Sequence, residues 1–188
     1  VASDRARDPE VGKHGTLAMA ILNAGVYLPV HAEDLNRADF EKSFAVNLSG
    51  VVNCLLPAIR HMKEKGQGQI AIVSSVTGYG GLPTGAAYGA TKAALINMTE
   101  SLKFDLDKMG IRIQLVSPGF VDTPATRKNA FPMPALVSVE EAARQIAAGL
   151  KSQVFEITFP KRFTTMLKLG RLLPYSAYFA LVNRATGW

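Results

Sequence analysis

The chain contains only one cysteine among its 188 residues. This excludes an internal disulfide, and it also excludes a zinc site built from several thiolates. Cys54 lies within the apolar run VVNCLLPAI, where we expect a small buried side chain. Such sparing use of cysteine is typical of proteins from reducing compartments, so the sequence favours a cytoplasmic location.

Long apolar runs are also missing. No stretch of about 18 apolar residues occurs, so we expect no transmembrane helix, and the polar start VASDRARDPEVGKHG does not resemble a secretory signal peptide. The net charge is +6, but no aromatic-basic motif is present, so we expect no nucleic-acid partner. The absence of a Gly-x-Ser-x-Gly pattern disfavours a serine hydrolase, and we expect no metal site.

What is present is an alternation of short apolar runs with longer helical patterns. The sequence predicts buried strands at residues 17–22, 69–75, 111–120 and 155–160, and helices over about 39–65, 85–109 and 138–152. Ser138 and Glu141 have the spacing of a capping box at the start of the last helix. This order predicts an α/β protein whose parallel sheet is covered by helices on both faces.

Ligands of such sheets bind where the strands end. The residues in these places are Asn23, Ala24 and Gly25 after the first strand, Ser74 and Ser75 after the second, and Pro118 and Gly119 after the third. We therefore expect a binding site along this edge of the sheet.

Tyr88 and Lys92 lie four residues apart at the start of a predicted helix, which places both side chains on one face. A neighbouring ammonium lowers the pKa of a tyrosine, so the pair is suited to acid-base chemistry near neutral pH. An isolated pair of this kind is more often structural. Ser75 follows a strand and could bind a substrate oxygen or simply end the strand. Asn47, within a long helix, could hold a water or mark a kink or surface position.

Taken together, Asn47, Ser75, Tyr88 and Lys92, with LNAG at 22–25 and SPGFVDT at 117–123, resemble the short-chain dehydrogenase/reductase family. The resemblance covers residues 17 to about 160. It implies a Rossmann-like, doubly wound sheet in three α/β/α layers, and hydride transfer between NAD(P) and a carbonyl or alcohol. We expect residues 1–160 to form this domain, with 161–188 as its amphipathic C-terminal tail.

The resemblance also implies a role for each residue. Tyr88 would be the general acid or base, and Lys92 would lower the Tyr88 pKa and bind the nicotinamide ribose. Ser75, rather than its neighbour Ser74, would hold the substrate oxygen, and Asn47 would position a water for proton relay. The implied cofactor contacts are Asn23, Ala24 and Gly25 beside the adenosine ribose, and Pro118, Gly119, Val121 and Thr123 beside the nicotinamide.

The glycine-rich turn with which this family binds pyrophosphate is missing ahead of LNAG, and GYGG at 78–81 follows the wrong strand. We therefore expect further βα units before residue 1, because strand 17–22 would otherwise be a bare apolar edge. The segment VASDRAR resembles the end of the family's second strand, where Ser3 and Arg5 would favour NADP and Asp4 would favour NAD. The alternative is a frayed surface segment. We expect NADP or NAD as cofactor, with NADP preferred.

The substrate is expected to be an apolar carbonyl or alcohol, since apolar side chains flank the site; they are Val76, Tyr79, Leu82, Phe131 and Met133. Hydrophobic lid packing without any substrate meaning is the alternative. Family resemblance further implies a homodimer or homotetramer formed through the helices at 39–65 and 85–109. Residues 161–188 either dock on the core or on a second subunit, or make peripheral contact with a membrane. The competing function is a catalytically inactive fragment that serves as a binding or assembly module.

Overall fold

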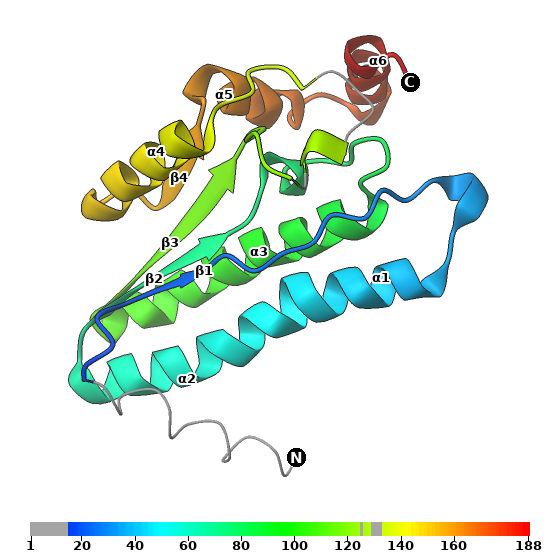
Figure 1. Cartoon of the computed structure of the whole chain (residues 1–188). Helices are drawn as coiled ribbons and strands as arrows, with labels where there is room; N and C mark the ends of the chain where they lie inside the picture. The colour runs from blue at the N-terminus through cyan, green and yellow to red at the C-terminus, as the bar shows by residue number, and fades with distance from the viewer. Residues whose placement is uncertain (1–14, 125, 129–132) are drawn as a thin grey trace.

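The computed structural model describes residues 15–124, 126–128 and 133–188 (Figure 1). Its centre is a four-stranded parallel sheet with the strand order β1-β2-β3-β4. The strands are β1 (Met19–Leu22), β2 (Gly68–Val73), β3 (Ile111–Pro118) and β4 (Glu156–Phe159). All four predicted strands are confirmed, and each is shorter than predicted.

Helices connect consecutive strands, and further helices follow β4. They are α1 (Arg37–Phe44), α2 (Gly50–Lys65), α3 (Ala86–Lys108), α4 (Val139–Lys151), α5 (Lys161–Gly170) and α6 (Tyr175–Thr186). A single π-helical turn, η2 (Ala45–Ser49), joins α1 to α2, so the long helix predicted at 39–65 is present with an irregular centre. Short 3-10 turns are η1 (Ala32–Asp34), η3 (Val76–Gly78) and η4 (Thr126–Lys128).

The helices form layers on both faces of the sheet (Figure 1). On one face, α2 and α3 pack through Leu55 and Leu95 against strand residues such as Ile70 and Ile113. On the other face, α4 packs through Ala142 and Leu150 against Val116 and Ile157. Alternate residues of each strand enter the two cores because side chains alternate across a strand. The three-layer α/β/α prediction is therefore confirmed.

Two local predictions need correction. Cys54 is exposed, because the buried stripe of α2 runs through Val51, Leu55, Ala58 and Met62 and turns Cys54 away from the sheet. Ser138 does cap α4 by accepting a hydrogen bond from the Glu141 amide at 3.1 Å. The Glu141 carboxylate, however, pairs with Arg144, so the capping box is only half formed.

Within the described residues, one helical stretch, Arg37–Lys65, has the length and apolar composition to cross a membrane. One of its faces packs against the sheet as a core helix, so length and composition alone carry little weight. At the outer edge of the sheet, β1 exposes Met19 and Ile21. This strand has no neighbour on its outer side among the described residues.

Candidate active site

The candidate residues come together at the carboxyl ends of the strands, around the start of α3. The loop after β2 carries Ser75, the first turns of α3 carry Tyr88 and Lys92, and η2 carries Asn47. A Cβ atom placed on Gly25, just after β1, would lie 3.6 Å from both Asn47 Oδ1 and Lys92 Nζ. Segments far apart in the sequence therefore meet in a single place.

Glycines allow the loop after β2 to lie directly on α3. A Cβ on Gly78 would come within 2.8 Å of the Lys92 backbone, and one on Gly89 would lie 3.3 Å from the Thr77 carbonyl oxygen. Any larger residue at Gly78 would push the loop away from the helix. The glycine-rich stretch between Ser75 and Tyr88 thus sets how closely the two residues approach.

The two adjacent serines after β2 do different things. The Ser74 hydroxyl is buried and donates to the Lys92 carbonyl oxygen at 2.9 Å, which fastens the strand to α3. The Ser75 hydroxyl accepts from the Thr77 amide at 3.3 Å, and its proximity to the Tyr88 hydroxyl lowers the Tyr88 pKa. Of the two, Ser75 is therefore the one beside Tyr88.

Burial dominates the electrostatics of Tyr88 and Lys92. It raises the Tyr88 pKa above its ordinary value, against the opposing effect of Ser75, and it lowers the Lys92 pKa to about 8. The Lys92 Nζ donates to the Val73 carbonyl oxygen at 2.9 Å and lies 5.5 Å from the centroid of the Tyr88 ring. Without a cofactor, the structure therefore does not show the lowered Tyr88 pKa expected from Lys92.

Asn47 is fully buried within the π-helical turn η2. Its Oδ1 accepts from the Val26 amide at 2.7 Å, and its Nδ2 donates to the Val26 carbonyl oxygen at 2.9 Å and to Thr91 Oγ1 at 3.2 Å. The side chain thus joins the loop after β1 to helix α3. Because both polar atoms of its side chain make these hydrogen bonds, we infer that Asn47 positions the loop after β1 against α3.

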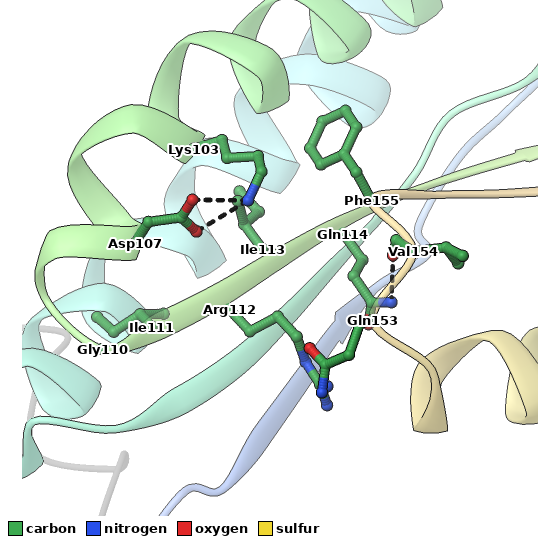
Figure 2. A pocket seen from close by; sticks show the side chains of 10 residues that line it. All are labelled: Lys103, Asp107, Gly110, Ile111, Arg112, Ile113, Gln114, Gln153, Val154 and Phe155. Atoms are coloured by element: carbon green, nitrogen blue, oxygen red, sulfur yellow. Dashed lines mark hydrogen bonds and ion pairs between the residues drawn. The ribbon is translucent and has the colours of Figure 1, made fainter.

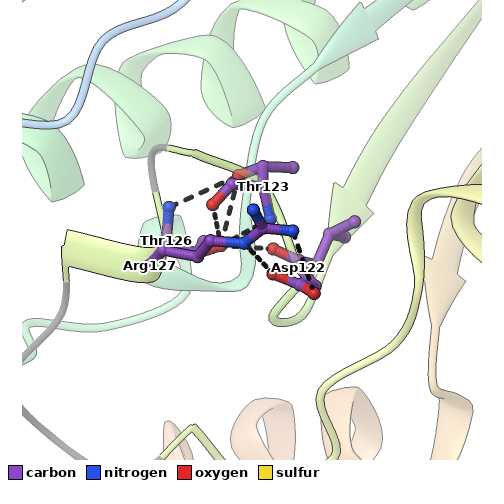
Figure 3. Close-up of polar contacts among 5 residues, drawn as sticks. Asp122, Thr123, Thr126 and Arg127 are labelled. Carbon is purple, nitrogen blue, oxygen red and sulfur yellow. Dashed lines mark hydrogen bonds and ion pairs between the residues drawn. The ribbon is translucent and has the colours of Figure 1, made fainter.

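The segment expected to contact the nicotinamide follows β3. Hydrogen bonds of the Thr123 and Thr126 hydroxyls hold it in a turn (Figure 3). Thr126 Oγ1 accepts from the Thr123 amide at 2.9 Å and donates to the Val121 carbonyl oxygen at 2.5 Å. Arg127 Nε donates to Asp122 at 2.8 Å, which lowers the pKa of that exposed carboxyl. Pro118 and Gly119 precede this turn, and the Gly119 amide donates to the Phe159 carbonyl oxygen at 2.8 Å.

The residues expected to line the substrate are less well placed. Val76 is only 3% exposed, which leaves little surface for a ligand, whereas Leu82 and Met133 are partly buried. The Tyr79 hydroxyl donates to Glu156 at 2.5 Å, and burial, with Glu156, raises the Tyr79 pKa. Phe131 lies outside the described residues.

Several contacts were not predicted from the sequence. The Tyr27 ring meets the Tyr88 ring edge-on at 5.2 Å, and its hydroxyl bonds Thr84 Oγ1 at 2.8 Å. Position just after β1 was the only sequence signal that could have indicated Tyr27. Phe163 of α5 packs on Phe120 with ring centroids 5.9 Å apart, and Tyr178 of α6 donates to the Gly81 carbonyl oxygen at 2.9 Å. The C-terminal helices therefore touch the loops of the site.

A separate pocket lies at the opposite end of the sheet, between the end of α3, the start of β3 and the segment before β4 (Figure 2). Its charged side chains include Lys103 and Asp107, which pair with each other at 2.7 Å, and Arg112. The amino ends of parallel strands are not where such sheets bind ligands. Among the described residues, no group of His, Cys, Asp or Glu could hold a metal ion.

Comparison with known proteins identifies the class that this fold and site define. A family model described as short chain dehydrogenase matches residues 5–132. The chain therefore belongs to the short-chain dehydrogenase family, which confirms the resemblance read from its motifs.

Three similar proteins illustrate this membership. An uncharacterized oxidoreductase of Myxococcus xanthus is 32% identical over 180 residues, which cover 96% of this chain and 70% of that protein. Cis-4-hydroxycyclohexanecarboxylate dehydrogenase of Sinomonas cyclohexanicum is 34% identical over 139 residues, covering 73% of this chain and 54% of the relative. A short chain dehydrogenase of Burkholderia cenocepacia, solved in complex with NADP, superimposes with a TM-score of 0.78 and 26% identity, covering 88% of this chain and 70% of that one.

The chain is shorter than these relatives. It spans 48% to 54% of the length of seven curated relatives, the Sinomonas enzyme among them.

Proposed function

We propose that the complete protein is an oxidoreductase that transfers a hydride between NAD(P) and a carbonyl or alcohol. The observation that carries this proposal is the convergence of Ser75, Tyr88, Lys92 and Asn47 at the carboxyl ends of the strands. The alternative, an inactive binding module, is not favoured, because an inactive module would have no need to keep these four side chains together.

The proton-transfer roles follow from the local chemistry. Tyr88 would give its proton to the carbonyl oxygen, and a pKa raised by burial keeps the phenol protonated at neutral pH, as a proton donor must be. Ser75, whose hydroxyl lies beside that of Tyr88, would hold the same oxygen while it gains charge. This protonation state suits reduction of a carbonyl better than oxidation of an alcohol.

Residues of this chain also fit the cofactor. The Lys92 ammonium has three donors, and one acceptor, the Val73 carbonyl oxygen, is recorded for it. A ribose diol would supply further acceptors, and Gly25 leaves the approach to Lys92 and Asn47 clear of a side chain. Thr123 and Gly119 would lie against the nicotinamide. NAD(P) itself would supply or accept the hydride.

NADP is preferred over NAD, since several similar solved structures hold NADP or NADPH. The substrate would be apolar, in keeping with the partial burial of Leu82 and Met133, which leaves both with some apolar surface. The test is a titration of the complete gene product with NADH and NADPH, followed by a panel of apolar carbonyls. We expect tighter binding of NADPH and substrate-dependent oxidation of it. Tighter NADH binding would reverse the cofactor assignment, and failure to bind either would contradict the proposed function.

Self-association would use the outer faces of α2 and α3. Leu56 is 42% exposed and Phe104 is 74% exposed on these helices, and apolar surface of this kind favours association. We propose a homodimer or homotetramer. Phe104→Glu should lower the molecular mass measured by light scattering, and an unchanged mass would show that α3 is not the contact.

A further inference from the structure

We propose that α5 and α6 form a docking surface for an anionic membrane. The surface, here called the C-terminal face, consists of the outward side chains of residues 161–188. It lies beyond the carboxyl ends of the strands, at the end of the sheet that carries the candidate site (Figure 1).

The charge of this segment differs from that of the rest of the chain. Residues 161–188 contain five basic residues and no Asp or Glu, against a net charge of +6 for all 188 residues. The five are Lys161, Arg162, Lys168, Arg171 and Arg184. Lys168 pairs with Glu156 and Arg171 lies over the Tyr175 ring at 5.5 Å. Lys161, Arg162 and Arg184 are exposed and can meet an anionic surface.

The outward side of α5 mixes these cations with apolar side chains. Lys161, Arg162, Thr165, Met166 and Leu169 line one shallow groove on it, and Met166 and Leu169 are well exposed. The opposite side of the helix buries Thr164 and Gly170. Long basic side chains can bury their stems beside apolar neighbours while their charges reach lipid headgroups.

Helix α6 continues the pattern with aromatic side chains. Tyr178 is its only buried residue, whereas Tyr175 and Phe179 are exposed and stack with ring centroids 5.9 Å apart. Trp188, beyond the end of the helix, is exposed too. Tyrosine and tryptophan favour the boundary between water and hydrocarbon, so this composition suits a helix that lies in the headgroup region.

A second copy of the chain is a poorer occupant of this face. In a symmetric dimer the same patch meets itself. Each copy would bring five basic residues and no acidic residue to the interface. Like charges held close in an interface oppose association. An anionic lipid surface, by contrast, complements both the cations and the exposed apolar side chains.

The C-terminal face lies next to the candidate active site. Phe163 of α5 packs on Phe120, and Tyr178 of α6 bonds Gly81, so both helices contact loops that flank the candidate site. A membrane held by this face would lie beside the side from which an apolar substrate would arrive. Membrane binding itself does not depend on the proposed oxidoreductase activity.

The test is flotation of the complete gene product with vesicles of phosphatidylglycerol or of phosphatidylcholine. We expect flotation with phosphatidylglycerol at low salt and little with phosphatidylcholine. The double variant Lys161→Gln/Arg162→Gln should weaken binding by about fivefold for each lost cation. Lys63→Gln/Lys65→Gln removes the same charge from exposed positions on α2 and should bind as the parent does. Leu169→Ser should also weaken binding.

Three outcomes would contradict membrane docking by this face. They are absence of flotation with phosphatidylglycerol, equal losses in the α2 control and the α5 double variant, and equal binding to the two lipids. A change of oligomeric state in the α5 double variant without vesicles would assign the face to a second copy instead. Circular dichroism of each variant checks that a loss of binding is not a loss of fold.

Discussion

Residues 74–92 and residues 161–188 lie at the same end of the sheet, but they are built in opposite ways. The first segment contains buried polar side chains: Ser74, Thr91 and Lys92 are each no more than 3% exposed. The second buries only Thr164, Gly170 and Tyr178 of its helices. The contrast indicates that the chemistry depends on fixed geometry in the interior, whereas the C-terminal face depends on exposed composition.

The largest effect should come from Tyr88→Phe, which removes the proton donor from the inner segment. We expect turnover to fall by about 10² to 10⁴ fold, the usual contribution of a general acid, while NADPH binding is retained. Tyr79→Phe is the matched control, because it removes a partly buried hydroxyl bonded to Glu156 and should leave turnover within a few fold. Steady-state kinetics of both variants check this, and equal losses would contradict the role of Tyr88.

The next effect concerns stability and pH, and arises from the buried ammonium of Lys92. Burial lowers its pKa from 10.5 to about 8, so between these values the unfolded chain holds a proton that the folded chain has lost. The free energy of unfolding should therefore rise with pH across this window. Relative to Lys92→Met, the parent should gain on the order of 3 kcal/mol between pH values of about 8 and 10.5.

Urea unfolding at several pH values, without cofactor, measures this difference. Lys108→Met, which removes an exposed ammonium from the same helix, is the matched control for the loss of one charge. A flat difference for Lys92→Met would show that Lys92 is not held in a desolvated place.

A smaller effect should follow from Gly78→Ala, which separates the loop from α3. The added Cβ would lie 2.8 Å from the Lys92 backbone, and we expect a loss of about 1–3 kcal/mol in stability from overpacking, with lower turnover. Gly81→Ala is the matched control in the same loop, because no atom lies within 4 Å of its Cβ. Thermal unfolding of the two variants compares them, and equal destabilisation would refute the close approach at Gly78.

The smallest effect should come from Tyr178→Phe, which loosens the contact between the two segments. Its hydroxyl donates to the Gly81 carbonyl oxygen at 2.9 Å, and loss of one such bond costs about 1 kcal/mol. We expect a slight loss of thermal stability, with turnover within a few fold of the parent. A loss of turnover as large as that of Tyr88→Phe would mean that α6 belongs to the catalytic machinery.

Much of the inner segment could be predicted from the sequence. Apolar periodicity located the strands and helices, and the four-residue spacing placed Tyr88 and Lys92 on one helix face. Local patterns of this kind depend on neighbours in the chain, so they are readable without a structure.

Contacts between distant residues could not be predicted in this way. The π-helical turn buries Asn47 because Val26 and Thr91, 21 and 44 residues away, complete its hydrogen bonds. Tyr79 was expected to line the substrate, but its hydroxyl bonds Glu156, 77 residues further on. The exposure of Cys54 likewise depends on which face of α2 packs against the sheet. The sequence does not show which face this is, because apolar residues stand on both sides of Cys54 in the chain.

Hydride transfer from a labelled cofactor tests the proposed reaction most directly. The complete gene product is mixed with NADPH deuterated at the nicotinamide C4 carbon and an apolar carbonyl, and the product alcohol is analysed by mass spectrometry. We expect deuterium on the carbinol carbon with the parent enzyme, and labelled alcohol formed about 10² to 10⁴ fold more slowly with Tyr88→Phe although that variant still binds NADPH. An unlabelled alcohol, or equal rates of labelling by the two enzymes, would contradict the proposed reaction.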